Sequence, residues 1–225
     1  MTEGSKLQGS GQLQGSGQLQ GARVAGARQL ELRCRCGHVT GVAHDVMPSS
    51  GFRVVCYCRY CQAFARFLDR PDVLDAVGGT DIFQMPPGRV EIVTGTDAVR
   101  CLQLSGKIYR WYTACCRTPI GNTAGARIPF VGLIHCFISG SPTELDDALG
   151  APRGQVNAES ATGPLPSGAP PPLSRGVIAL HILRVLGWWL RGLGRPNPFF
   201  DAQTGAPCSA PRKLTPDERA AVLPI

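Results

Sequence analysis

The sequence predicts a mainly β protein built from antiparallel sheets, with a C-terminal helical appendage. Most apolar runs in the central region are short and alternate with polar residues, and Gly or Pro turn signals separate them. A long apolar run occurs only near the C-terminus. The 28 Gly and 19 Pro of the 225 residues cluster toward the ends, so we expect one compact domain with appendages.

The first 28 residues predict a disordered, low-complexity tail. Residues 7–18 repeat LQGSGQ twice, and such a Gly/Ser/Gln segment buries too little apolar area to offset the entropy lost on ordering. The N-terminus shows neither the basic region nor the apolar region of a secretory signal. This pattern favours a cytoplasmic protein.

Residues 29–145 predict the β-domain. Two short strands flank a tight turn in LELRCRCGHVTGVAHDV, a third strand covers 52–55, and apolar residues at helical spacing predict a helix over 61–68 that Pro71 limits. Four further strands are expected to form a β-meander: 80–84, 89–94, 99–104 and 107–112. A turn is expected at 118–122, and the apolar run 130–138 predicts a buried strand that closes the sheet.

The chain beyond the β-domain predicts a spacer and then helices. Residues 146–175 are rich in Ala, Gly, Pro and Ser and predict an extended linker, and 176–225 predict an amphipathic helix with a C-terminal tail. One stripe of this helix is polar or aromatic: His181, Arg184, Trp188, Arg191 and Arg195. We expect the apolar remainder to dock on the β-domain; contact of 177–193 with a membrane surface is the less favoured alternative. A capping box predicts a short final helix: Thr215, Pro216 and Glu218.

Seven of the ten cysteines lie in closely spaced clusters. Because disulfides are rare in a reducing compartment, this spacing indicates metal or thiol chemistry. The clustered residues are Cys34, Cys36, Cys56, Cys58, Cys61, Cys115 and Cys116. Neighbouring thiolates can bind one soft cation, and Zn²⁺ prefers a tetrahedron of sulfur and nitrogen ligands. Sulfurs on adjacent residues rarely reach one ion without strain, so one of Cys115 and Cys116 is expected to be the better ligand.

The remaining candidate residues receive simpler interpretations. The isolated cysteines are expected to be small core residues: Cys101, Cys136 and Cys208. His135, in the apolar run LIHCFI, is predicted to be a hydrogen-bonded core histidine, and His38 is a substitute metal ligand beside the first cluster. Lys and Arg are scattered without interleaved aromatic residues, so the net charge of +7 indicates solubility and no nucleic-acid partner.

The three cysteine motifs resemble those of the glutathione-dependent formaldehyde-activating enzyme family, which includes centromere protein V. That family carries CxCG, then CxCxxC, then a CxxCGTP-like segment; this chain has CRCG from Cys34, CYCRYC from Cys56 and TACCRTPI from Thr113. The resemblance covers about residues 30–140. With the CC-x-TP form and the PFFD segment near Phe199, the chain looks like a bacterial branch of the superfamily. The resemblance implies a small, zinc-binding, β-tent-like domain.

The resemblance also implies one structural and one more open zinc site. Carried over to this sequence, the structural positions are Cys34, Cys36 and Cys116, and the open-site positions are Cys56, Cys58 and Cys61. Thr113 stands at the remaining structural position, and a hydroxyl is a poor zinc ligand beside thiolates. Either Cys115 supplies the fourth sulfur or the site is incomplete. Arg117 stands where the family has glycine.

The resemblance implies a carbon–sulfur lyase-like activity on a small thiol adduct of the glutathione type. The open zinc position would bind the substrate, and the sequence identifies no general base. Two alternatives remain. One is a non-catalytic, zinc-stabilised binding or scaffold module; the other is a thiol redox protein or metal buffer, which needs exposed thiolates and labile metal.

Overall fold

The computed structural model describes residues 26–223, and in this range the chain is mainly β, as predicted, with eleven strands and four α-helices. The small, antiparallel sheet contains β1 (Arg28–Arg33), β2 (Thr40–Val46) and β5 (Val90–Thr94). The large sheet contains, in spatial order, β10 (Gln155–Val156), β3 (Phe52–Cys56), β4 (Thr80–Met85), β9 (Val131–Ile134), β8 (Pro119–Thr123), β7 (Ile108–Thr113), β6 (Val99–Ser105) and β11 (Pro211–Lys213). The expected tail, residues 1–28, lies outside the described residues except for 26–28.

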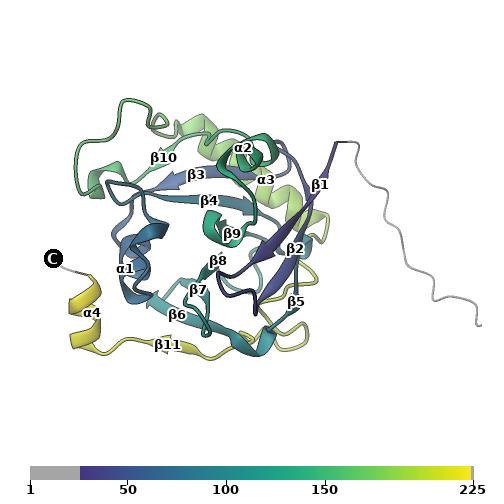
Figure 1. Cartoon of the computed structure of the whole chain (residues 1–225). Coiled ribbons are helices and arrows are strands. Elements are labelled where there is room, and N and C mark those ends of the chain that lie inside the picture. Colours follow the sequence, from purple (N-terminus) through teal and green to yellow (C-terminus); the bar gives the residue numbers. More distant parts are fainter. Residues whose placement is uncertain (1–25, 224–225) are drawn as a thin grey trace, which may run out of the picture.

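The helices lie around these sheets. They are α1 (Arg59–Phe67), α2 (Pro142–Leu149), α3 (Arg175–Leu190) and α4 (Pro216–Val222). Figure 1 shows the large sheet curving from β3 and β4 at the top, through β9 and β8, to β6 and β11 at the bottom, with the small sheet on the right. The main apolar core lies between the two sheets and includes Leu32 and Val39 of the small-sheet region and Phe83 and Leu133 of the large sheet.

Several local predictions are confirmed. The strands on either side of the CRCG turn are β1 and β2, which pair antiparallel. The helix expected at 61–68 is α1, whose N-cap is Cys58. The capping box at the start of α4 forms as expected, because the Thr215 hydroxyl accepts from the Glu218 N–H and the Glu218 carboxylate accepts from the Thr215 N–H.

The predicted β-meander is wrong in its first half. Strand β5 pairs with β2 in the small sheet, whereas β4 pairs with β3 and β9. Of the four strands predicted for the meander, only β6 and β7 are consecutive strands that pair with each other, and the turn expected at 118–122 is strand β8. The run 130–138 contains the fully buried strand β9, but this strand lies between β4 and β8 rather than closing an edge. Alternation identifies a strand, whereas its partner depends on long-range packing.

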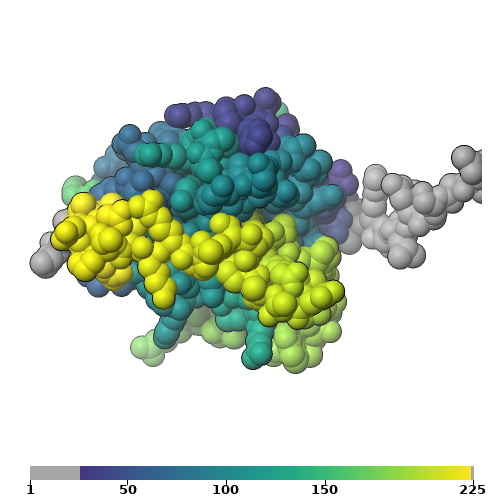
Figure 2. Space-filling view, turned by 90° about the horizontal axis from the view of Figure 1, so that it is seen from below, coloured from purple at the N-terminus to yellow at the C-terminus, as the bar shows by residue number. Residues whose placement is uncertain are grey.

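The segment expected to be a linker also contributes to the fold. Residues 146–175 include the end of α2 and strand β10, which pairs parallel with β3 through Gln155↔Val55. The Leu173 N–H donates to the Gln155 carbonyl, so the Pro-rich stretch lies against β10. At the other edge, β11 pairs parallel with β6. In Figure 2 this yellow C-terminal segment lies across one face of the molecule. Both edge strands of the large sheet therefore come from the chain beyond residue 145.

Helix α3 docks on the β-domain, but through the side opposite to the one predicted. His181 stacks on Phe52 with ring centroids 4.2 Å apart, Arg184 donates to the Gly51 carbonyl, and Trp188 is buried. The apolar side is exposed instead, together with Arg191. Periodicity identifies a stripe but not the direction it faces, and here the stripe contacts the β-domain through the His181 ring and the Arg184 guanidinium. Within residues 26–223, no helix combines the length and apolarity needed to cross a bilayer.

The PFFD segment after α3 ties the C-terminal part of the chain to the core. Phe199 is fully buried and stacks on Trp111 of β7 at a centroid distance of 5.0 Å. Phe200 meets the same indole edge-on at 5.5 Å. The Trp111 indole N–H donates to the Thr123 hydroxyl at 2.9 Å, which fixes the ring that both phenylalanines contact.

We therefore expect Phe199→Ala to destabilise the whole domain. Removing a fully buried aromatic ring leaves a cavity against Trp111 and should lower the free energy of unfolding by about 3 to 5 kcal/mol. Urea unfolding, followed by tryptophan fluorescence, measures the change. Val93→Ala, at a side chain that is 57% exposed, is the control and should stay within about 0.5 kcal/mol of wild type. A Phe199→Ala loss below about 1 kcal/mol would mean that the segment is not part of the cooperative core.

Candidate metal centres

Two turns from different sheets bring four cysteines together. Cys34 and Cys36 lie in the turn between β1 and β2, and Cys115 and Cys116 lie in the turn between β7 and β8. The Sγ–Sγ distances are 3.6 Å for Cys34–Cys36, 3.9 Å for Cys34–Cys115, 3.4 Å for Cys36–Cys115 and 3.9 Å for Cys115–Cys116. Tetrahedral Zn²⁺ binds thiolate sulfur at about 2.3 Å, which places neighbouring sulfurs about 3.8 Å apart. The four sulfurs therefore have the spacing of a tetrahedral thiolate site.

This geometry changes the interpretation of the third motif. Adjacent sulfurs were expected to compete, yet both Cys115 and Cys116 belong to the group. The turn that allows this passes through Arg117, whose φ of 56° lies in the left-handed region that favours glycine. The family that the cysteine motifs resemble has glycine at this position. Here an arginine adopts the left-handed conformation that glycine reaches without steric cost.

The first motif has the hydrogen bonds of a metal-binding knuckle. The Val39 N–H donates to the Cys34 sulfur at 3.2 Å, and the Gly37 N–H donates to the Cys34 carbonyl at 2.8 Å. Gly37 has a φ of +78°, which explains the glycine after Cys36. An N–H group that points at a sulfur stabilises its thiolate form and fixes its direction.

Thr113 supports the first group without supplying one of its sulfurs. Its hydroxyl lies 3.4 Å from the Cys116 sulfur, and the Thr118 hydroxyl lies 3.2 Å from the same atom. Burial raises the pKa of Cys116, but hydrogen bonds from the two hydroxyls and from the Cys36 backbone outweigh it and lower the pKa to about 5. The residue at the position of the expected fourth cysteine thus stabilises the neighbouring thiolate.

The second group contains three cysteines around the start of α1. Cys56 ends β3, Cys58 caps α1 and Cys61 lies in its first turn. The three sulfurs lie within 4.8 Å of one another, and Cys56 and Cys61 are 3.8 Å apart. Hydrogen bonds from Cys56 and Cys61 lower the pKa of Cys58, which caps the helix.

The two groups differ in number of sulfurs and in burial. In the first group Cys36 and Cys115 are exposed, whereas in the second group Cys56 and Cys61 are buried and Cys58 is partly exposed. The site that the resemblance marks as open is thus the more buried one. The word open here refers to the coordination of a metal ion, because three sulfurs leave one tetrahedral position without a cysteine. Solvent reaches the group on the Cys58 side.

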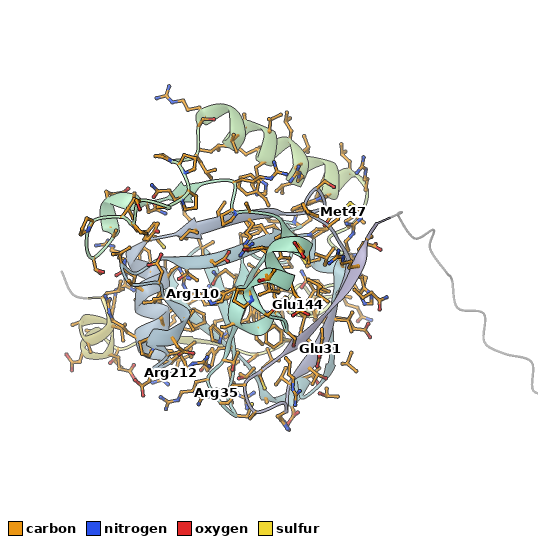
Figure 3. The ribbon with its side chains drawn as sticks, turned by 45° about the horizontal axis from the view of Figure 1, so that its top comes forward. Glu31, Arg35, Met47, Arg110, Glu144 and Arg212 are labelled. Carbon is orange, nitrogen blue, oxygen red and sulfur yellow. The ribbon has the colours of Figure 1, made fainter. Side chains whose placement is uncertain are left out.

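A buried arginine, which the sequence analysis did not identify, lies beside the second group. Arg110 of β7 is 4% exposed, and its Nη1 lies 3.7 Å from the Cys61 sulfur and 3.1 Å from Asn122 Oδ1. Figure 3 shows it in the interior of the molecule, close to α1. Its Nε atom has no hydrogen-bond partner. Among the described residues, the buried Arg53 and Arg70 pair with aspartates, but no carboxylate pairs with Arg110. Among the described residues, the ionisable group in hydrogen-bond contact with its guanidinium is Cys61 of the cysteine cluster.

A second polar neighbour comes from the strand at the sheet edge. The Asn157 side-chain amide lies 3.7 Å from the Cys56 sulfur, and Asn157 follows β10 directly. No local sequence signal marks Arg110 or Asn157, because each reaches the cluster from a strand far away in the chain. Sequence alternation places Arg110 on one face of β7 but does not indicate what covers that face.

The other candidates stay outside both groups. His38 is exposed, and His135 is partly buried with its Nδ1 3.4 Å from the Asp81 carbonyl, the environment predicted for a core histidine. Cys101 is buried in the core, as predicted, and burial raises its pKa to about 12. Cys136 is only partly buried, and the prediction of a core position is wrong for Cys208, which is exposed. All ten cysteines are free thiols.

Fold and site together define a mainly β protein with two cysteine groups that could each hold a metal ion. The chain belongs to a family of unknown function, DUF6151, whose model matches residues 27–210. This match extends beyond the segment that carries the cysteine motifs and includes β10, α3 and the PFFD segment. No curated protein matches the chain.

Single substitutions in the two groups should have different effects. Cys36→Ser removes a ligand that joins two turns 79 residues apart, so we expect loss of one metal ion and a melting temperature lower by ~10 °C or more. Cys58→Ser alters a group confined to residues 56–61 and should lose one ion while shifting the melting temperature by less than about 4 °C.

Elemental analysis of protein produced in zinc-supplemented medium measures the metal content, and thermal unfolding measures the melting temperature. Cys208→Ser, at an exposed cysteine outside the groups, is the matched control and should keep both ions and the wild-type melting temperature. Equal destabilisation by Cys36→Ser and Cys58→Ser would contradict this division between the groups.

Proposed function

We propose that this protein is a cytosolic zinc protein with one structural ion and one ion that binds a small thiol. The four-cysteine group would hold the structural ion, and the three-cysteine group would hold an ion with one coordination position left for a thiol of the glutathione type. The difference between four and three convergent sulfurs carries this proposal.

The donor set supports zinc as the metal. Within the described residues both groups offer only thiolate sulfur, a soft ligand that suits Zn²⁺ and excludes hard cations such as Mg²⁺ and Ca²⁺. The spacing of the four-sulfur group agrees with the edge of a zinc–thiolate tetrahedron. A reducing compartment would keep these thiols available for metal, which is why the proposal places the protein in the cytosol.

The charge around the three-cysteine group favours an anionic ligand. Three thiolates around a divalent ion carry a net charge of 2 − 3 = −1, and a fourth thiolate makes it −2. Arg110 provides a buried positive charge next to Cys61, and the Asn157 amide faces Cys56. These two side chains reduce the electrostatic cost of adding a fourth sulfur. A zinc ion in this group would supply a Lewis acid that lowers the pKa of the thiol bound to it.

The reaction class that we propose rests on the resemblance of the CxCG and CxCxxC motifs. It is the formation or cleavage of a carbon–sulfur bond in a thiol–aldehyde adduct. In the forward direction the thiol sulfur bonds to the carbonyl carbon and the thiol proton passes to the carbonyl oxygen; cleavage reverses both changes. In this scheme the protein holds the sulfur next to Arg110 and within reach of solvent at Cys58, and we assign no residue as general base.

Glutathione binding to the zinc-loaded protein tests this proposal. Isothermal titration calorimetry should show binding to the wild type and none to Cys58→Ser. Arg110→Met, which removes the buried charge while keeping most of its apolar volume, should weaken binding by about tenfold, the effect of one lost charge–charge contact of ordinary strength. Arg100→Met, at an exposed arginine of the neighbouring strand β6, is the control and should bind as the wild type does.

The same samples separate binding from catalysis. Nuclear magnetic resonance of ¹³C-formaldehyde with glutathione should show adduct exchange accelerated by the wild type and not by Cys58→Ser. Thiol binding without acceleration would contradict the lyase activity and leave a thiol-binding module. Absence of thiol binding by protein that carries both zinc ions would contradict the function proposed for the three-cysteine group.

A further inference from the structure

The outer side of α3 is a continuous apolar surface. Seven large apolar side chains on this helix are between 42% and 71% exposed: Ile178, Leu180, Ile182, Leu183, Leu186, Trp189 and Leu190. In Figure 3 the helix runs along the upper rim of the molecule, and the side chains on its outer side project away from the sheets. Soluble proteins seldom expose so many large apolar side chains together unless the surface contacts a partner.

The surface extends beyond the helix. Ile128, in the loop between β8 and β9, is 44% exposed and lines an apolar groove together with Val185 and Trp189. Elsewhere in residues 26–223, Val93 is the one other large apolar side chain with comparable exposure. The exposed apolar area is therefore concentrated on α3 and the loop beside it.

The charged residues in the chain segment that contains α3 are all basic. Residues 160–200 contain no Asp or Glu. Arg175 begins α3, and Arg191 and Arg195 follow its last turn; all three are exposed. A cation at the N-terminus opposes the helix dipole, so Arg175 does not serve the stability of the helix. A partner of this surface must therefore match both its apolar side chains and the arginines at its two ends.

We propose that α3 lies flat on an anionic membrane surface, with its apolar side in the headgroup and upper acyl region and its arginines among the lipid phosphates. The helix is about 24 Å long at 1.5 Å for each of its 16 residues, which suits an in-plane helix, and Trp189 is a residue type that favours this interface. Anionic lipid complements the basic ends of the helix.

A second copy of the chain fits these charges poorly. In a parallel pair of α3 helices Arg175 meets Arg175, and in an antiparallel pair Arg175 meets Arg191. Because α3 carries no acidic residue, neither arrangement pairs these arginines with a carboxylate of the helix. The observations thus favour lipid over self-association.

Vesicle co-sedimentation of the full-length, zinc-loaded protein tests this inference. The wild type should bind vesicles containing phosphatidylglycerol and bind those of phosphatidylcholine alone at least about tenfold more weakly. Leu180→Glu with Leu183→Glu should reduce binding to the anionic vesicles by at least about tenfold, because two apolar anchors are replaced by charges of the wrong sign. Arg175→Gln with Arg191→Gln should also reduce it by about tenfold or more.

The controls keep this result independent of folding and of the metal sites. Val93→Glu changes an equally exposed apolar residue on β5 and should bind vesicles as the wild type does. Both leucines on α3 point to solvent, so the double glutamate variant should retain its zinc content and melting temperature. Equal vesicle binding by the wild type and this variant would overturn the inference. The inference would also be overturned if light scattering showed a dimeric wild type and a monomeric variant while neither protein bound vesicles.

Discussion

The spacing that four sulfur atoms need around one metal ion relates the two sheets of this protein to each other. Cys34 and Cys36 belong to the turn of the small sheet, and Cys115 and Cys116 belong to a turn of the large sheet. A shift of either turn by even 1 Å would move sulfurs out of the range of one ion, because zinc–thiolate distances vary by only about 0.2 Å. The same interface contains the apolar core around Leu32 and Leu133. A metal ion bound by these four cysteines would thus require the same relative position of the sheets as the core packing does.

The second group depends on a different set of contacts, which link it to the C-terminal half of the chain. Cys56 and Cys61 pack in a cluster with Phe52, and Val156 of β10 and Val177 of α3 lie against this cluster. The segment after residue 145 therefore forms part of the wall around the three-cysteine group. The family match, which extends to residue 210, includes these covering residues. A shorter domain would leave this group without its cover.

Much of the local structure could be predicted from the sequence, because its causes are local. The glycine after Cys36, the cysteine spacing before α1 and the Thr215 capping box each act within a few residues. The partner of β5 could not be predicted, since alternation is the same in either sheet. Arg110 was missed for a similar reason: a buried charge is recognised only when its neighbours are known, and these come from a helix 49 residues away in the chain. One of Cys115 and Cys116 was expected to be the better ligand, because the left-handed Arg117 that shapes the turn is not evident from the residue type.

The orientation of α3 is set by the side chains that contact the β-domain, through ring stacking and one hydrogen bond. His181 lies between the rings of Phe52 and Trp188. Burial is the larger cause, and the charge of the nearby Arg184 the smaller one, that lowers the pKa of His181 to about 4. The imidazole is therefore neutral at physiological pH. Arg184 reaches the Gly51 carbonyl. The stripe facing the sheet therefore carries one half-buried cation with an acceptor, while leucines face water, an arrangement that costs free energy in an isolated domain. A helix selected only to cover the β-domain would present its leucines inward; the observed orientation is favourable when the outer side has an apolar environment of its own.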